Sequence, residues 1–156
     1  MTTIIIPFYG YLNSRINKLW NITKIAKKRR LNFSNREGIG SNVLAVDEQK
    51  RKLIYLKNTP NTSSCLLKDL STLDRCSVTK EYNSIPAGYL ENKKLNHFLK
   101  NILLNLSFKN NSKKIILPLY QAEKDNGEDV IQLEAKAKKW ETIISKFKLI
   151  ELIKSA

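Results

Sequence analysis

Few side chains in this sequence have the type and spacing that catalysis or metal binding requires. His97 is the only histidine, and it lies between Asn96 and Phe98 without a recognisable motif around it. A metal site built from several histidines is therefore excluded, and a Ser-His-Asp or Cys-His arrangement would depend on this one residue. We interpret His97 as a surface or half-buried structural residue.

The two cysteines, Cys65 and Cys76, lie eleven residues apart and are not accompanied by a second pair. Neither a disulfide framework nor a four-ligand zinc site can be built from two such residues. We expect both to be reduced thiols. On this basis we predict no metal site and no cofactor.

The other sequence motifs also lack the features that chemistry would need. Gly38-Ile39-Gly40 is without the third glycine of a dinucleotide-binding fingerprint and precedes a strand-like run, not a helix. Acidic residues gather at Asp47-Glu48, in an expected hairpin turn, and between Glu123 and Asp129, at an expected helix start. Turn chemistry and the helix dipole explain both groups. We predict that the protein is not an enzyme and has no catalytic residues.

Positive charge is the feature of the composition that bears most on function. The net charge is +14, and residues 1–36 hold eight basic side chains and no acidic one. The candidate binding residues belong to this segment and to a polar connection further along the chain: Lys24, Lys27, Lys28, Arg29, Arg30, Lys50, Arg51 and Lys52. A basic segment of this kind could steer the protein to nucleic acid or to an anionic membrane surface. Lys, Asn and Ile are all abundant, however, so compositional bias is the alternative explanation of the charge.

Aromatic residues near the Lys27-Lys28-Arg29-Arg30 run allow two interpretations of its target. A basic run with Tyr11, Trp20 and Phe33 nearby is typical of a nucleic-acid-binding segment, and equally of a short interfacial helix at a membrane. The sequence alone leaves these alternatives and the oligomeric state open. No apolar stretch has the length of a signal-peptide core or the ~20 residues of a membrane span. We therefore expect a cytoplasmic protein that can be peripheral to the membrane.

Apolar residues at helical spacing predict a helix between Tyr11 and Leu31. A linker-like stretch rich in Asn, Ser and Gly follows it. We therefore expect two domains, a basic helical N-terminal arm of residues 1–36 and a folded domain of residues 37–156. On this division, a chain that begins near Phe33 should fold by itself.

Beyond the arm, short β-prone runs with turn residues between them replace the helical pattern. We expect strands at residues 43–46, 53–57, 65–67, 73–82, 102–108 and 114–120, of which the first two and the last two form hairpins. In the fourth strand, the face that carries Asp74, Cys76, Val78, Lys80 and Tyr82 is the more apolar and should point inward. Pro118 cannot donate to a ladder, which predicts an edge strand or a bulge there. Residues 85–99 show no periodicity, and we expect a loop.

The strongest pattern in the sequence is an amphipathic helix near the C-terminal end. Apolar residues at alternating spacings of three and four form a single stripe: Val130, Leu133, Ala137, Trp140, Ile144 and Phe147. Asp129 can cap the start of this helix, with Gln132 three residues further on. Such a stripe needs a sheet to cover it, so we expect the helix to close the core and Trp140 to anchor it.

Two hairpins, the strands between them and one terminal amphipathic helix with Trp140 on its inner stripe resemble the pleckstrin-homology-like (PH-like) superfold. The Val46-Asp47-Glu48 step that opens the first expected hairpin is similar to that of small uncharacterised bacterial proteins with PH-like domains. The resemblance implies an α+β, mainly β fold. Its core would be a bent antiparallel sheet or partly open barrel, capped by the long C-terminal helix and preceded by the helical N-terminal arm.

The same resemblance implies a binding function. Many domains of this superfold bind peptides or serve as scaffolds. In members that bind phosphoinositides, basic residues surround the first hairpin; Lys50 and Lys52 match one such position, whereas Ala45-Val46-Asp47 supplies no lysine at the other. We therefore expect a non-enzymatic binding or scaffold module that contacts a protein partner or an anionic membrane surface. Binding of nucleic acid through the basic arm is the alternative.

Overall fold

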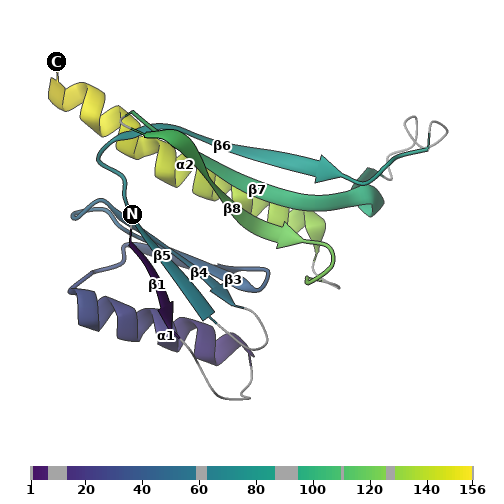
Figure 1. Cartoon of the computed structure of the whole chain (residues 1–156), viewed down its shortest axis with the longest axis horizontal. Coiled ribbons are helices and arrows are strands. Elements are labelled where there is room, and N and C mark those ends of the chain that lie inside the picture. Colours follow the sequence, from purple (N-terminus) through teal and green to yellow (C-terminus); the bar gives the residue numbers. More distant parts are fainter. Residues whose placement is uncertain are drawn as a thin grey trace. The chain divides into compact units, whose positions relative to one another are not determined.

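The computed structural model describes residues 2–6, 14–58, 63–86, 95–109, 111–125 and 129–155. The chain forms two compact units, Met1–Ser71 and Thr72–Ala156 (Figure 1). Each unit contains an antiparallel sheet and an α-helix, and strands predominate. The expected class, α+β and mainly β with a C-terminal helix, is confirmed at this level.

Unit 1, Met1–Ser71, is built on a five-stranded antiparallel sheet with the strand order β1-β5-β4-β3-β2. Its strands are β1 (Thr2–Ile6), β2 (Asn35–Ile39), β3 (Asn42–Asp47), β4 (Lys52–Asn58) and β5 (Ser63–Asp69). β3 and β4 pair from Val43 opposite Leu56 to Asp47 opposite Lys52, so the expected hairpin is confirmed. The expected short strand at residues 65–67 is the middle of β5.

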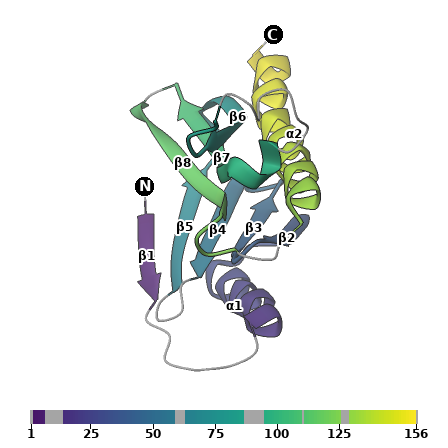
Figure 2. The same cartoon turned by 90° about the vertical axis from the view of Figure 1, so that its right-hand side faces the viewer.

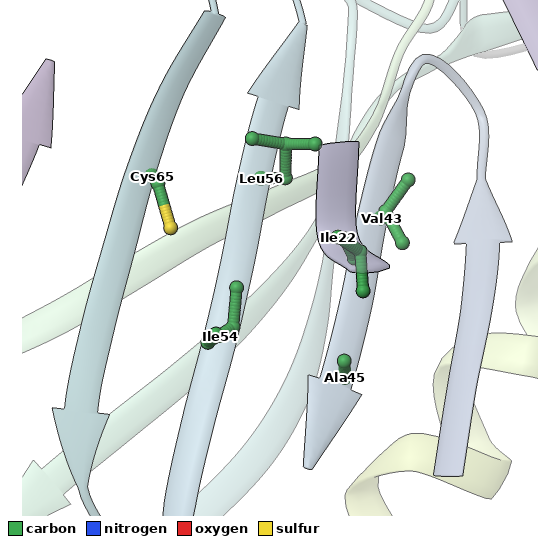
Figure 3. Packing of buried hydrophobic residues seen from close by; sticks show 6 residues of the cluster. All are labelled: Ile22, Val43, Ala45, Ile54, Leu56 and Cys65. Atoms are coloured by element: carbon green, nitrogen blue, oxygen red, sulfur yellow. The ribbon is translucent and has the colours of Figure 1, made fainter. Parts of the chain in front are cut away.

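The helix predicted between Tyr11 and Leu31 is confirmed as α1 (Ser14–Arg29). It lies against one face of this sheet, which the pattern did not predict. Ile22 is fully buried in a cluster with side chains of β3, β4 and β5 (Figure 3): Val43, Ala45, Ile54, Leu56 and Cys65. Alternate residues of a strand point to the same face, which is why Val43 and Ala45 reach the helix together. Leu31 and Phe33 are partly buried against the same cluster. The helix and the chain after it therefore belong to the core of unit 1.

The N-terminal segment is not the separate arm that the sequence pattern suggested. β1 pairs with β5 and β2 pairs with β3, so two strands that the pattern did not predict belong to the same sheet as the hairpin. The burial of Ile22 fixes α1 to that sheet. The compact units divide after Ser71, not after residue 36. A chain that begins near Phe33 would lack β1 and α1, and we do not expect it to keep this core.

Unit 2, Thr72–Ala156, contains a three-stranded antiparallel sheet with the order β6-β7-β8. Its strands are β6 (Leu73–Tyr82), β7 (Leu99–Phe108) and β8 (Asn111–Gln121), which confirms the second expected hairpin. On β7, Ile102, Leu104, Leu106 and Phe108 are buried, as their alternation predicted. Pro118 lies in the end strand β8 beside a register shift, so the expected edge position and bulge are both confirmed.

The inward face expected for β6 is only partly correct. Cys76, Val78 and Tyr82 are half-buried, but Asp74 and Lys80, which should share their face, are exposed. A register shift follows Leu73, so the strict alternation fails at the start of the strand. Leu73, on the face expected to point outward, is fully buried, and Ser77 of that face is half-buried like Cys76 and Val78.

The segment that we expected to be a loop, residues 85–99, contains a short helix. η2 (Leu95–Phe98) is a single turn of 3-10 helix, and Leu99 already begins β7. The middle of the expected loop, residues 87–94, lies outside the described residues. A single turn is too short for a 3.6-residue period to be visible in the sequence.

Helix α2 (Val130–Ser155) runs along the sheet of unit 2 and contacts its three strands (Figure 2). Asp129 caps the helix as predicted, because its Oδ1 accepts a hydrogen bond from the backbone N–H of Ile131 at 3.0 Å. Five of the six residues of the predicted stripe are buried: Leu133, Ala137, Trp140, Ile144 and Phe147. Val130, in the first turn, is half-buried. The amphipathic C-terminal helix is confirmed.

α2 also binds the edge strand of its sheet. The Glu141 carboxylate accepts a hydrogen bond from the backbone N–H of Val78 in β6 at 2.6 Å, and Glu134 pairs with Lys80 Nζ at 3.4 Å. Burial lowers the pKa of Lys80, but the charges and hydrogen bonds of Glu134 and Tyr82 together outweigh burial, and the pKa lies above its ordinary value. An edge strand exposes backbone groups that other chains could pair with. Glu141 occupies one of them.

Candidate functional site

Two short basic segments that are far apart in the sequence meet in unit 1. One is the last turn of α1 with the residue after it, Lys27 to Arg30; the other is the turn between β3 and β4, which contains Lys50 and Arg51. Lys50 Nζ donates a hydrogen bond to the backbone carbonyl oxygen of Arg30, 20 residues earlier in the chain. The structure therefore joins two groups of candidate residues that the sequence presents as separate runs.

Backbone hydrogen bonds explain why α1 ends at this place. The N–H of Leu31 donates to the carbonyl oxygen of Ala26 at 2.9 Å, and the N–H of Arg30 to that of Lys27 at 3.4 Å. This pair of bonds is the Schellman arrangement, in which the residue after the helix is left-handed. Arg30 occupies that position with a φ of 54°. Cations in the last turn also compensate for the negative end of the helix dipole.

Asp47 links the β3–β4 turn to the chain that follows α1. Its side chain is almost fully buried; Oδ1 accepts the backbone N–H of Lys50 at 2.9 Å, and Oδ2 accepts that of Asn32 at 2.8 Å. Burial raises the pKa of this carboxyl, but the backbone hydrogen bonds outweigh burial and hold the pKa below its ordinary value. Asp47 is thus an ionised structural residue, which confirms the interpretation of Asp47-Glu48 as turn residues.

Unit 1 carries little negative charge to balance its cations. It has thirteen basic residues against four acidic ones. Asp47 is engaged in the turn, the Asp69 carboxylate pairs with Lys52 Nζ at 2.8 Å, and Glu48 Oε1 accepts a hydrogen bond from Asn35 Nδ2 at 3.2 Å. Glu37 has an interaction of its own. α1 contains no acidic residue. Within the described part of the chain, no carboxylate forms an ion pair with the cations of its last turn.

We use the name basic cluster for the cations of the two adjoining segments: Lys27, Lys28, Arg29, Arg30, Lys50 and Arg51. Arg51 is half-buried and the others are exposed. Two predicted site residues stay outside the cluster. The charge of Lys52 is paired with Asp69, and Lys24 lies about one turn earlier on α1 and has an interaction of its own.

The other side chains that were considered for chemistry do not assemble into a site. Within the described residues, no group of three or more His, Cys, Asp or Glu side chains could hold a metal ion. His97 is exposed on η2. Burial raises the pKa of Cys65 to about 11 despite the nearby charge of Arg29, and burial together with the charge of Glu141 raises that of Cys76 to about 12. Both cysteines are free thiols, and neither is an activated nucleophile.

A polar hollow lies in unit 2, where β8 ends. Its lining residues are Lys100, Asn101, Gln121, Ala122, Glu123 and Lys124. Part of its polar surface is already satisfied, because the Gln121 N–H donates to Asp125 Oδ2 at 2.9 Å and the Ala122 N–H to the Lys100 carbonyl oxygen at 2.9 Å. None of the predicted site residues lines this hollow.

Comparisons with known proteins add no assignment. No protein-family model, no curated protein and no solved structure matches this chain. The helices in the described part of the chain include none with the length and hydrophobicity that a membrane-spanning helix needs.

Sequence reasoning identified the cations of the site but not the contacts that join them. The spacing of Asp47 and Lys50 is a signal that was available, since a carboxylate at the start of a turn often accepts an N–H a few residues later. The bond from Asn32 to the same carboxylate spans 15 residues and leaves no local pattern. The left-handed conformation of Arg30 and Arg51 is also without a signal, because neither is a glycine or an asparagine.

Proposed function

We propose that this protein is a non-enzymatic, PH-like binding module that contacts an anionic membrane surface through the basic cluster. The observation that carries the proposal is the hydrogen bond from Lys50 to the Arg30 carbonyl oxygen, because it unites two basic segments in one surface. The second support is the lack of acidic residues on α1. Cations that are exposed and not neutralised within the chain are available to an external anion.

The charge of the basic cluster is sufficient for a weak and reversible membrane contact. Each Lys or Arg close to an anionic leaflet contributes about 1 kcal/mol. Six such residues give roughly 6 kcal/mol when all are engaged, which corresponds to a dissociation constant of about 40 µM. The Debye length is only about 8 Å at physiological ionic strength, so added salt must weaken this contact.

A protein partner fits the basic cluster less well than a membrane does. Protein interfaces are anchored by aromatic and apolar side chains that become buried inside a polar rim. Among the described residues, the exposed large apolar side chains are Ile116 and Ile131, and both belong to unit 2. The cluster itself offers charge without such an anchor.

The order of elements supports the PH-like part of the proposal. After α1, β2 to β5 and β6 to β8 are consecutive antiparallel strands, and α2 follows them, so these seven strands precede a C-terminal helix as in the superfold that the sequence resembles, while β1 is an additional strand of the first sheet. Because β2 precedes it, the β3–β4 hairpin is the second of its sheet. The match of Lys50 and Lys52 to the first hairpin of PH domains therefore carries no weight, and the argument for an anionic surface depends on charge alone.

Vesicle binding tests the proposal. The full chain is mixed with vesicles of phosphatidylcholine alone or of phosphatidylcholine with phosphatidylserine, and the bound fraction is measured by co-sedimentation between about 50 and 200 mM salt. We expect binding to the anionic vesicles only, with an affinity that falls as salt rises. Lys27→Gln combined with Lys28→Gln should reduce the affinity about 25-fold, since each charge contributes about fivefold.

A matched pair of substitutions in unit 2 provides the control. Lys114→Gln combined with Lys146→Gln removes the same charge from exposed positions outside the basic cluster, and should reduce the affinity much less. Equal losses for the two pairs would mean that net charge and not the cluster carries binding. The absence of any binding to anionic vesicles at low salt would refute the proposal.

Duplex DNA is the competitor in a second arm of the experiment. Neutralising about six phosphates would give a slope of roughly −5 in a plot of log K against log salt. If DNA shows this slope and displaces the protein from the vesicles at equal charge concentration, nucleic acid is the target and the membrane proposal is wrong.

A further inference from the structure

Two residues of the basic cluster have an unusual backbone conformation. Arg30 and Arg51 have φ angles of 54° and 53°, and in the described part of the chain they are the residues other than glycine with a positive φ. Glycine adopts this left-handed region without steric cost, and Gly40, with a φ of 58°, does so in the turn between β2 and β3. An L side chain in this region brings its Cβ too close to the following carbonyl oxygen. Both positions therefore hold a residue that the backbone disfavours.

Backbone contacts do not explain why either position is an arginine. Arg30 stands where glycine is most common after a helix, and its carbonyl oxygen, not its side chain, accepts the hydrogen bond from Lys50. Arg51 also uses its carbonyl oxygen, which accepts the N–H of Leu70 at 2.8 Å. Glycine at either position would make the same backbone hydrogen bonds. The only group that glycine would lose is the arginine side chain.

We propose that Arg30 and Arg51 are phosphate-contact residues that the chain keeps at these two turns at a cost in stability. The inference rests on the proposed function and adds the chemical group that is recognised, the phosphate oxygens of anionic lipid headgroups. A guanidinium presents a planar fork of N–H donors that matches two phosphate oxygens, whereas a lysine amine acts as a point charge. Backbone strain of this kind concentrates at binding sites, where the side chain and not the backbone is needed.

Glycine and glutamine substitutions separate the stability part of this inference from the binding part. Arg30→Gly and Arg51→Gly remove both the guanidinium and the steric cost. Each should raise the melting temperature by about 1 to 4 °C and weaken binding to phosphatidylserine vesicles about fivefold. Arg30→Gln and Arg51→Gln remove the charge but keep a side chain in the left-handed region, so they should weaken binding equally and leave the melting temperature unchanged.

The control is Arg75→Gln, which removes an exposed guanidinium from β6 in unit 2 and should change neither quantity. Glycine variants that bind as tightly as the wild type would overturn the inference and leave the proposed function standing, because the lysines would then carry the contact. Glycine variants that melt at an unchanged or lower temperature, or that fail to fold, would overturn the inference as well, since arginine would then impose no cost.

Two further results would refute either the proposed function or the assignment of the ligand. If the wild-type chain binds no anionic vesicle, the proposed function falls and this inference falls with it. If calorimetry shows tight binding of inorganic phosphate, and Arg30→Gly abolishes it, the arginines recognise free phosphate and the assignment to a lipid headgroup is wrong. We expect no measurable heat from inorganic phosphate, because a single phosphate ion in solution can contact only a few cations of the basic cluster at the same time.

Discussion

Trp140 lies in the middle of α2 and is 1% exposed. Among the described residues, it has the largest of the fully buried side chains. Its neighbours on the buried stripe are Ala137 and Ile144, about one turn before it and one turn after it. Trp140→Ala would remove an indole ring from between the helix and its sheet. The surrounding side chains are close-packed and can refill such a space only in part. We expect a large loss of stability from this one substitution.

The size of the loss follows from the area that the ring removes from water. A buried tryptophan covers about 200 Å², which at about 25 cal/mol per Å² gives roughly 5 kcal/mol. Alanine retains part of this burial, and the residual cavity adds a cost, so the expected change in the free energy of unfolding is about 3 to 5 kcal/mol. A whole domain has only about 5 to 15 kcal/mol. Urea unfolding followed by far-UV circular dichroism should show a much lower midpoint with the slope unchanged.

Two other variants keep this test decisive. Trp140→Phe retains a ring and should destabilise the protein less than Trp140→Ala, which gives a measurable value if the alanine variant does not fold. Lys146→Ala, at an exposed position of the same helix, should change the free energy of unfolding by less than about 0.5 kcal/mol. A urea midpoint for Trp140→Ala equal to that of Lys146→Ala would refute the argument that α2 closes the core of unit 2.

Three other predictions concern individual side chains. Glu141→Ala leaves the N–H of Val78 without its acceptor and should cost about 1 to 3 kcal/mol, measured by the same urea titration. Burial raises the pKa of Asp69, but hydrogen bonds from Lys52 and Ser71 lower it from 3.8 to about 2. The carboxylate therefore stabilises the fold above pH 4, and this stabilisation is lost as the pH falls towards 2. Since Asp69 is half exposed, the amount is about 1 kcal/mol or less, and Asp69→Asn should flatten the acid side of the stability profile. Because burial raises the thiol pKa values to about 11 and 12, both cysteines should react with iodoacetamide far more slowly at pH 8 in the folded protein than in urea; equal rates would contradict their burial.

Local patterns were reliable where the free energy of an element depends on residues that are close in the sequence. The stripe from Leu133 to Phe147 and the cap at Asp129 are both set within one helix, and the structure confirms both. The alternation around Leu104 likewise reports directly which side of β7 is buried, because the side-chain period of a strand is two. In β6 the same alternation predicted that Asp74 points inward, and this was wrong because a register shift interrupts the strand there.

The basic character of the chain, the two hairpins and the amphipathic helix that follows them could all be predicted from the sequence. The tertiary structure was needed to show that Thr2–Ile6 and Asn35–Ile39 are strands of the same sheet as the β3–β4 hairpin, since Thr2 pairs with Leu67 and no nearby residue records that pairing. The same holds for the basic cluster. Lys50 reaches the Arg30 carbonyl oxygen because the sheet holds the β3–β4 turn beside the end of α1. Contacts of this kind join residues that are far apart in the sequence. The free energy that selects them comes from the burial of residues such as Ile22, and helical periodicity does not predict which residues Ile22 packs against.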